Sequence, residues 1–139
     1  MPAPKDYDSL KAKGEKAIGT MSAFLNDTQI LDTKTITYVR GNEVYMFFGE
    51  SEDRSFVLLS FPEALDPSEI HTVRYPEDFE GLNSSWQAAD KNSPLTVKKG
   101  SLTQLKFFDS GKRSFEGTFD IDLEGDLGKL TGKFHIPKQ

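Results

Sequence analysis

The sequence contains no cysteine, which excludes disulfide bonds, thiolate metal sites and a cysteine nucleophile. Histidine is scarce as well, because only His71 and His135 are present and they lie far apart in the chain. There is no HExxH, no GxSxG, no phosphate-binding glycine loop and no dinucleotide fingerprint. These absences favour a protein that is not an enzyme and that carries neither a metal ion nor a cofactor.

Long apolar runs and an excess of positive charge are also missing. No run approaches the roughly 18 apolar residues of a membrane-spanning helix, so no transmembrane segment is predicted. The 17 Lys and Arg against 22 Asp and Glu give a net charge of -5, which argues against nucleic acid as a partner. One cluster of basic residues is interpreted as part of a solvent-exposed surface. It comprises Lys98, Lys99, Lys106, Lys112 and Arg113.

The first 18 residues are predicted to be a leader or a short helix, followed by a single β-sandwich domain over residues 19–139. Gly14 interrupts a helical pattern over residues 5–17, and the apolar stripe is thin. Its main apolar side chains are Tyr7, Leu10 and Ile18.

Two cellular locations stay open. Residues 1–4 carry no hydrophobic signal core. Pro2, Ala3 and Pro4, followed by a lysine-rich segment, resemble a tether downstream of a cleavage site. An exported protein is therefore slightly favoured over a cytosolic one.

The most informative pattern is a strict alternation of apolar and polar residues over 114–124 and again over 129–136. A period of two with one apolar face is typical of a half-buried β-strand. Similar short segments with close turn signals predict an all-β fold of about 8–10 strands, either an antiparallel sandwich or a flattened barrel. The expected strands cover residues 20–25, 35–40, 43–49, 55–61, 70–75, 85–89, 95–97, 102–108, 114–124 and 129–136.

The acidic residues of the 114–124 strand are expected to face lysines rather than to bind calcium. A calcium loop of the helix–loop–helix type needs a glutamate at its twelfth position, where Thr131 stands. Cross-strand charge pairs would instead fix the register of the hairpins. The expected pairs are Glu124 with Lys129, Asp120 with Lys133, Lys106 with Glu116, Phe119 with Phe134, and Leu105 with Gly117.

The central strands differ, because residues 44–48 and 56–61 are apolar on both faces. A strand of this kind must be covered on both sides. Either the leader or a long loop lies over the outer face, or that face is a binding patch. Cover from within the chain is the favoured interpretation.

Aromatic residues near loops and edge strands provide the candidate binding site. Such rings can stack on sugars or anchor a protein partner, although a lone tryptophan in a sandwich more often belongs to the core. The candidates are Trp86, Tyr75, Phe79 and Tyr45.

The block LTQLKFFDSGKRSFEGTFDIDL…GKLTGKFHI resembles the closing hairpins of uncharacterised bacterial cell-envelope proteins of the lipoprotein type. Those domains end in a strand, an Asp-led turn, an rSGTF-type stretch and a G-x-F strand. The earlier ITYVRGNEVYMFFGESEDRSFVLLSF is similar to a hairpin and following strand of the same domains. The resemblance implies an exported, often lipid-anchored β-sandwich of unknown function, although this chain lacks the lipid-acceptor cysteine. The matching residues are Ser114, Gly117, Thr118, Phe119, Gly132 and Phe134, with Phe115 and Glu116 inserted.

Three hypotheses for the function follow. The first is a non-catalytic binding or envelope-associated domain that contacts a protein or carbohydrate through loops or an apolar sheet face, as a monomer or weak homo-oligomer. The second is a carrier with a small hydrophobic ligand inside a barrel. The third is a hydrolase with an unrecognised site.

Overall fold

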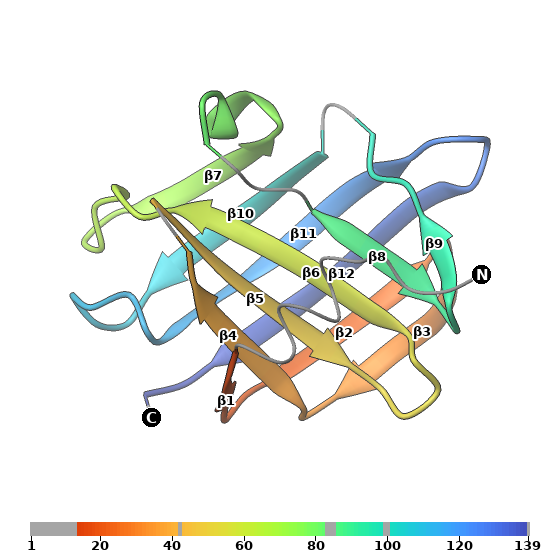
Figure 1. The fold of residues 1–139 in the computed structure, drawn as a ribbon, viewed down its shortest axis with the longest axis horizontal. Helices are drawn as coiled ribbons and strands as arrows, with labels where there is room; N and C mark the ends of the chain where they lie inside the picture. Colours follow the sequence, from red (N-terminus) through yellow and green to blue (C-terminus); the bar gives the residue numbers. More distant parts are fainter. Residues whose placement is uncertain (1–13, 42, 83–85, 99–100, 139) are drawn as a thin grey trace.

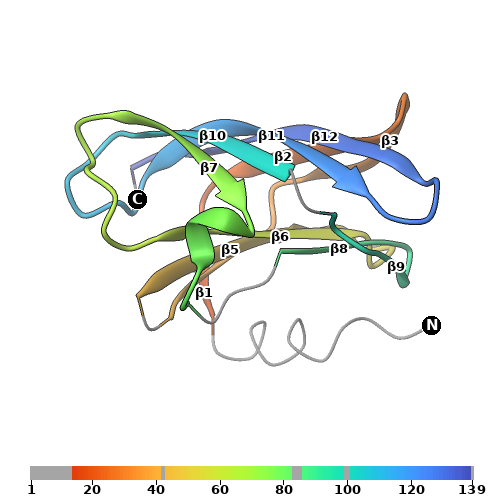
Figure 2. The same cartoon turned by 90° about the horizontal axis from the view of Figure 1, so that it is seen from above.

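Two antiparallel sheets of six strands each pack face to face and form a β-sandwich (Figures 1 and 2). The computed structural model describes residues 14–41, 43–82, 86–98 and 101–138. We call the sheets A and B. In spatial order, sheet A contains β1 (Glu15–Ala17), β4 (Ile36–Arg40), β5 (Val44–Glu50), β6 (Phe56–Pro62), β8 (Gln87–Asp90) and β9 (Ser93–Leu95). Sheet B contains β3 (Thr28–Thr33), β2 (Thr20–Leu25), β12 (Gly128–Ile136), β11 (Phe115–Leu123), β10 (Ser101–Phe107) and β7 (Ile70–Tyr75).

The predicted all-β sandwich is confirmed, whereas the flattened barrel is not, because the two sheets do not close into one. The chain changes sheets between β1 and β2, where Gly19 lies against β12. A Cβ at Gly19 would stand only 2.8 Å from the carbonyl oxygen of His135, so a side chain has no room at this crossing. A short 3-10 helix, η1 (Glu77–Phe79), follows β7 and covers one end of the sandwich (Figure 1).

The helix predicted over residues 5–17 is wrong for its last turn, and the rest of it lies outside the described residues. Glu15–Ala17 forms β1, which pairs with β4 along Tyr38, Thr37 and Ile36. The open edge of β4 offers backbone hydrogen bonds to these residues. A thin apolar stripe interrupted by Gly14 gives little to stabilise a helix in competition with that edge.

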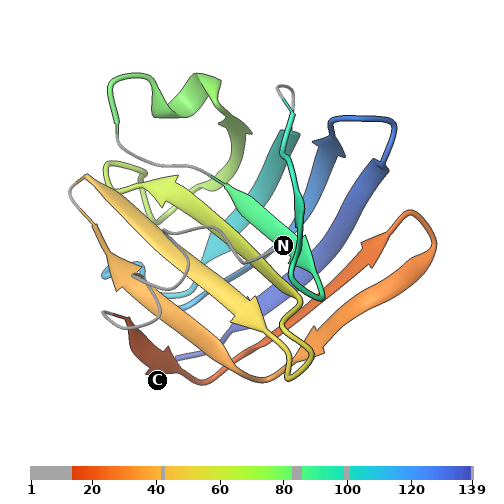
Figure 3. The same ribbon diagram turned by 45° about the vertical axis from the view of Figure 1, so that its right-hand side comes forward.

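The strand β3 was not predicted. It pairs with β2 through the turn at Asn26 and Asp27, and Figure 3 shows this hairpin in orange at one border of sheet B. A register shift between Ala23 and Phe24 breaks the period of two. The inward side of β3 also includes the polar Thr33, which is buried and donates to the backbone oxygen of Glu50 at 2.6 Å. These two features hide the alternation that marks the other strands.

Aromatic side chains fill the space between the sheets. Phe47 of β5 lies 4.9 Å, centroid to centroid, from both Phe115 and Phe134 of sheet B. Phe61 of β6 makes similar edge-to-face contacts with Phe107 at 5.2 Å and Phe115 at 5.3 Å. Edge-to-face pairs at these separations are attractive beyond the area that they bury. Residues of both sheets thus meet in one core, as the alternation predicts.

The registers of the C-terminal hairpins were predicted with partial success. Between β10 and β11, Lys106 faces Glu116 and Leu105 faces Gly117, as expected. Between β11 and β12 the predicted register is wrong by two residues, because the turn comprises residues 124–127 rather than 125–128. Lys129 therefore faces Asp122 instead of Glu124. A shift of two keeps every side chain on its predicted face.

The corrected register creates two glycine–aromatic pairs on the buried face. Gly117 faces Phe134 and Gly132 faces Phe119, and the two rings stack at 6.5 Å with an angle of 9°. A Cβ at Gly117 would lie 2.8 Å from Phe134 Cζ, and one at Gly132 would lie 2.9 Å from Phe119 Cε1. Each glycine thus leaves the room that the opposite ring occupies.

The second apolar face of the central strands is buried, as predicted. Phe48, Phe56, Leu58 and Ala89 form a separate cluster on the outer side of sheet A, with Met46 packed against it. Their exposed fractions are 0–1%. Residues 1–13 of the predicted leader lie outside the described residues.

Candidate functional site

The four aromatic residues that the sequence suggested as a binding site do not form one exposed platform. Trp86 is 3% exposed, Phe79 4% and Tyr45 5%. Trp86 stacks on Tyr75 at 5.0 Å with an angle of 19°, and it meets Phe79 edge-on at 5.8 Å. Its indole nitrogen donates to Ser60 Oγ at 3.0 Å, so both its ring and its polar atom are satisfied within the fold.

Tyr45 lies apart from this group, in β5. Its ring packs edge-on against Phe61 at 5.4 Å, and its hydroxyl lies 3.4 Å from Glu63 Oε1. A ring that stacks on a ligand needs an exposed face, and the three buried rings have none in this conformation. The structure therefore gives Trp86, Tyr75 and Phe79 a packing role at the end of the sandwich that η1 covers.

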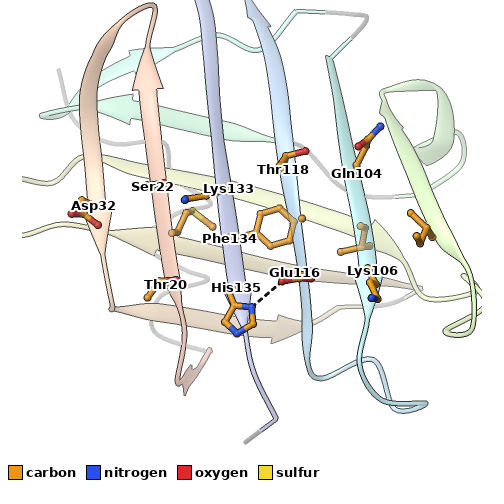
Figure 4. A pocket seen from close by; sticks show the side chains of 14 residues that line it. Thr20, Ser22, Asp32, Gln104, Lys106, Glu116, Thr118, Lys133, Phe134 and His135 are labelled. Atoms are coloured by element: carbon orange, nitrogen blue, oxygen red, sulfur yellow. Dashed lines mark hydrogen bonds and ion pairs between the residues drawn. The ribbon is translucent and has the colours of Figure 1, made fainter.

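A different surface has the shape of a binding site. A groove of about 770 Å³ runs over the outer face of sheet B, across β2, β12, β11 and β10 (Figure 4). The side chains of these strands alternate, so every second residue points away from the core into the groove. The floor lies over the backbone and inner residues Met21, Leu105, Gly117 and Phe134.

One row of outward side chains crosses the centre of the groove. The registers place Ser22 beside Lys133, Lys133 beside Thr118, and Thr118 beside Gln104. The sequence distances between these residues are large, and only the pairing of four strands brings them together. Among the described residues, none of these four side chains has a hydrogen bond or ion pair within the protein. Their polar atoms are open to solvent and to a ligand.

A second row borders the first and carries alternating charge. It runs from Thr20 through His135, Glu116 and Lys106 to Ile70. His135 Nδ1 lies 3.2 Å from Glu116 Oε2, the contact drawn as a dashed line in Figure 4. Both side chains are about half exposed, so solvent screens the pair and its contribution to stability is small. Glu116 also lies opposite Lys106 of β10 in the register.

Two exposed apolar side chains stand at the borders of this surface. Ile70 of β7 lines the groove and is 73% exposed. Phe24 of β2 is 37% exposed and lines an adjoining depression of about 490 Å³, which shares Ser22, Gln104, Thr118 and Lys133 with the groove. The two hollows thus form a continuous surface along the sheet, with polar side chains in the middle and Phe24 and Ile70 toward its ends. Asp32 of the edge strand β3 also lines the groove, beside Ser22.

The acidic strand β11 does not form a metal site with the described residues. No group of three or more His, Asp or Glu in the described ranges could hold a metal ion. Lys129 Nζ instead lies 3.1 Å from Asp120 and 3.4 Å from Asp122. The hydrogen bond with Asp120, followed by its charge and the contact with Asp122, raises the pKa of Lys129. As predicted, acidic residues of β11 pair with a lysine. The lysine beside Asp120 is Lys129, however, and not Lys133.

The turn between β10 and β11 holds two strands of the groove in place. Asp109 Oδ1 accepts hydrogen bonds from the Ser114 and Arg113 backbone amides at 2.8 and 3.1 Å, and from Ser114 Oγ at 2.6 Å. The Lys112 ammonium donates to the backbone oxygens of Glu63 and Leu65, on the connection from β6 to β7. This turn therefore anchors the β10–β11 hairpin to the opposite sheet.

The carboxylate of Asp109 makes this anchor sensitive to acid. Burial raises the pKa of Asp109, but the hydrogen bonds from Ser114 and Arg113 outweigh it and lower the pKa below 3.8. A lowered folded-state pKa means that the ionised group stabilises the fold above its unfolded pKa, and that this contribution disappears as the pH falls through the folded value.

We therefore expect Asp109→Asn to be less stable than the wild type at pH 7 and equally stable in acid, once Asp109 is protonated in both the folded and the unfolded state. Urea unfolding between pH 7 and pH 2.5 would measure the difference. Asp27→Asn, at the exposed turn between β2 and β3, is the matched control and should show no such convergence. A difference between Asp109→Asn and wild type that stays constant over this range would contradict the role given to the carboxylate.

Comparisons with family models, with curated proteins and with solved structures give no match, so the groove is interpreted from its own geometry. Among the described residues, no helix has both the length and the apolar character needed to cross a membrane.

Proposed function

We propose that the protein is a non-catalytic binding domain and that the groove on sheet B holds a hydroxyl-bearing ligand such as a saccharide chain. The observation that carries this proposal is the central row of Ser22, Lys133, Thr118 and Gln104, whose polar atoms have no partner among the described residues. A groove of about 770 Å³ is within the size range of small-molecule sites.

The chemistry of the row supports a ligand rich in hydroxyl groups. Serine and threonine hydroxyls and the glutamine amide can each donate and accept hydrogen bonds, as sugar hydroxyls do. Lys133 adds three donors in the middle of the row. Phe24 and Ile70 could cover the apolar faces of sugar rings at the borders.

The two other hypotheses have less support. A carrier with an internal barrel cavity requires a barrel, and the sheets do not close into one. A hydrolase that uses a pair of carboxyl groups needs an apolar pocket around one of them. Asp120 and Asp122 are 47% and 40% exposed and pair with Lys129. The pair of His135 and Glu116 is similarly exposed.

We also propose that the protein is exported and associates with a bacterial cell envelope. This part of the proposal rests on the sequence resemblance of residues 36–61 and 102–136 alone. A saccharide ligand would be consistent with that location, because envelopes are rich in polysaccharides.

A glycan microarray probed with the labelled protein tests the proposed ligand. Thr118→Trp should fill the centre of the groove and lower the signal on any bound glycan at least tenfold, because it excludes the ligand from the row. Thr28→Trp, at the exposed turn between β2 and β3, is the matched control and should leave binding and melting temperature unchanged. Wild-type protein that binds no glycan, or Thr118→Trp protein that binds as wild type does, would contradict the proposal.

A further inference from the structure

A second, smaller cleft lies where sheet A meets the β10–β11 turn. Its volume is about 440 Å³, and its walls come from β1, β4 and Arg113. Two hydrogen bonds close this corner. Tyr38 Oη donates to the Lys112 oxygen at 3.3 Å, and Arg40 Nη2 donates to the Gly111 oxygen at 3.1 Å. The cleft is therefore built on a docked turn rather than on an isolated strand edge.

Tyr38 holds the turn that carries Arg113, because its hydroxyl donates its only proton to the Lys112 oxygen. Its ring packs against Tyr45 at 5.9 Å and Phe115 at 6.3 Å, which holds the side chain in place. Burial, partly offset by the nearby Arg40, raises the pKa of Tyr38 to about 12. The phenol consequently keeps its proton at neutral pH and maintains its hydrogen bond to the Lys112 oxygen.

Arg40 is held by two contacts that leave most of its donors free. Its Cζ lies 4.7 Å from the centroid of the Tyr45 ring, and its Nη2 donates a hydrogen bond to the Gly111 oxygen. A guanidinium has five N–H donors in a planar fork, so several remain available. Arg113 brings a second guanidinium to the same cleft from the turn.

The charge of the cleft is opposite to that of the whole chain. Lys16, Arg40 and Arg113 line it together with one carboxylate, Glu15, although the net charge of the protein is -5. Among the described residues, none of the three basic side chains forms an ion pair. Two guanidinium groups and an ammonium around one small hollow repel one another, and a bound anion would offset that repulsion.

We infer that this cleft binds the carboxylate or phosphate group of a small ligand, with Arg40 and Arg113 as the binding groups and Tyr38 as the residue that positions the turn carrying Arg113. Guanidinium forks match the paired oxygens of both anions. Lys16 adds charge at the rim. The site is separate from the groove on sheet B and does not depend on the function proposed for that groove.

An NMR titration of the full chain with sodium phosphate and, separately, with sodium citrate tests this site, with ionic strength held constant by sodium chloride. Saturable shifts of the Gly111, Lys112 and Arg113 amides are expected with at least one of the two anions. The anion that binds more tightly identifies phosphate or carboxylate as the preferred group. Shifts that do not saturate with either anion would overturn the inference.

Charge variants distinguish a built site from general attraction. Arg113→Gln should weaken anion binding tenfold or more. Its guanidinium has no hydrogen bond or ion pair with the described residues, so the fold should be retained. Glu15→Gln should tighten binding by removing the competing carboxylate. Arg74→Gln, an exposed arginine on β7, is the control and should leave the affinity unchanged. Equal weakening by Arg113→Gln and Arg74→Gln would show that only net charge matters and would refute the site.

Discussion

Replacing Phe47 by alanine is expected to lower the free energy of unfolding by about 3–5 kcal/mol, the range found for large buried aromatic side chains. Phe47 is 1% exposed and is the ring of sheet A that touches both Phe115 and Phe134 of sheet B. Its removal leaves a cavity at the point where the two sheets meet, and the flanking rings belong to rigid strands that cannot collapse into it.

Urea unfolding followed by tryptophan fluorescence would measure this loss. Phe24→Ala is the matched control, because Phe24 is on the outer face of sheet B and is 37% exposed. We expect the control to cost less than about 1 kcal/mol. Similar losses for both variants would mean that the inner faces of the sheets have been assigned incorrectly.

Deleting residues 1–13 is expected to make the protein self-associate and bind a hydrophobic dye. The chain enters sheet A at β1, and the apolar cluster of Phe48, Phe56 and Leu58 lies on the outer side of that sheet. An extended chain covers about 3.3–3.6 Å per residue and strands are about 4.8 Å apart, so thirteen residues are long enough to reach over β5 and β6. If Tyr7 and Leu10 cover this cluster, which is one of the covers that the sequence allows, their removal exposes several large apolar side chains at once.

Size-exclusion chromatography and dye fluorescence would measure the effect. A shorter truncation, which removes only residues 1–4 and keeps Tyr7 and Leu10, is the matched control and should remain a monomer without dye binding. A monomeric protein that binds no dye after removal of all thirteen residues would mean that the leader does not protect this face.

The sequence was sufficient for the all-β class, because alternation is a local signal, but it did not decide between a sandwich and a flattened barrel. Alternation over residues 114–124 and 129–136 is complete, and both strands are present within one residue at each end. The register of β10 with β11 was also predictable, because the turn residues Asp109–Gly111 define it. Gly125 lies in the β11–β12 turn and Gly128 begins β12, and both have positive φ. Either could end the turn by composition, and the observed register is the one that places Gly132 opposite Phe119.

The groove could not be predicted to the same degree. Ser22, Lys133, Thr118 and Gln104 each have the composition of an ordinary solvated strand face. Their alignment in one row depends on the pairing of β2 with β12, which joins residues more than a hundred positions apart in the chain. The aromatic candidates failed as an exposed platform for a related reason. Whether Trp86 lies inside or outside depends on η1 and Tyr75 packing over it, which no local pattern of residues reveals.

Chemical-shift mapping with the glycan selected on the microarray tests the central claim most directly. If the groove on sheet B is the binding surface, the perturbed amides will lie in β2, β12, β11 and β10, centred on Ser22, Thr118 and Lys133. The indole signal of Trp86 will stay in place. Perturbations that gather instead on Trp86, Tyr75 and η1, with the strands of sheet B unchanged, would contradict the account and place the ligand at the end of the sandwich.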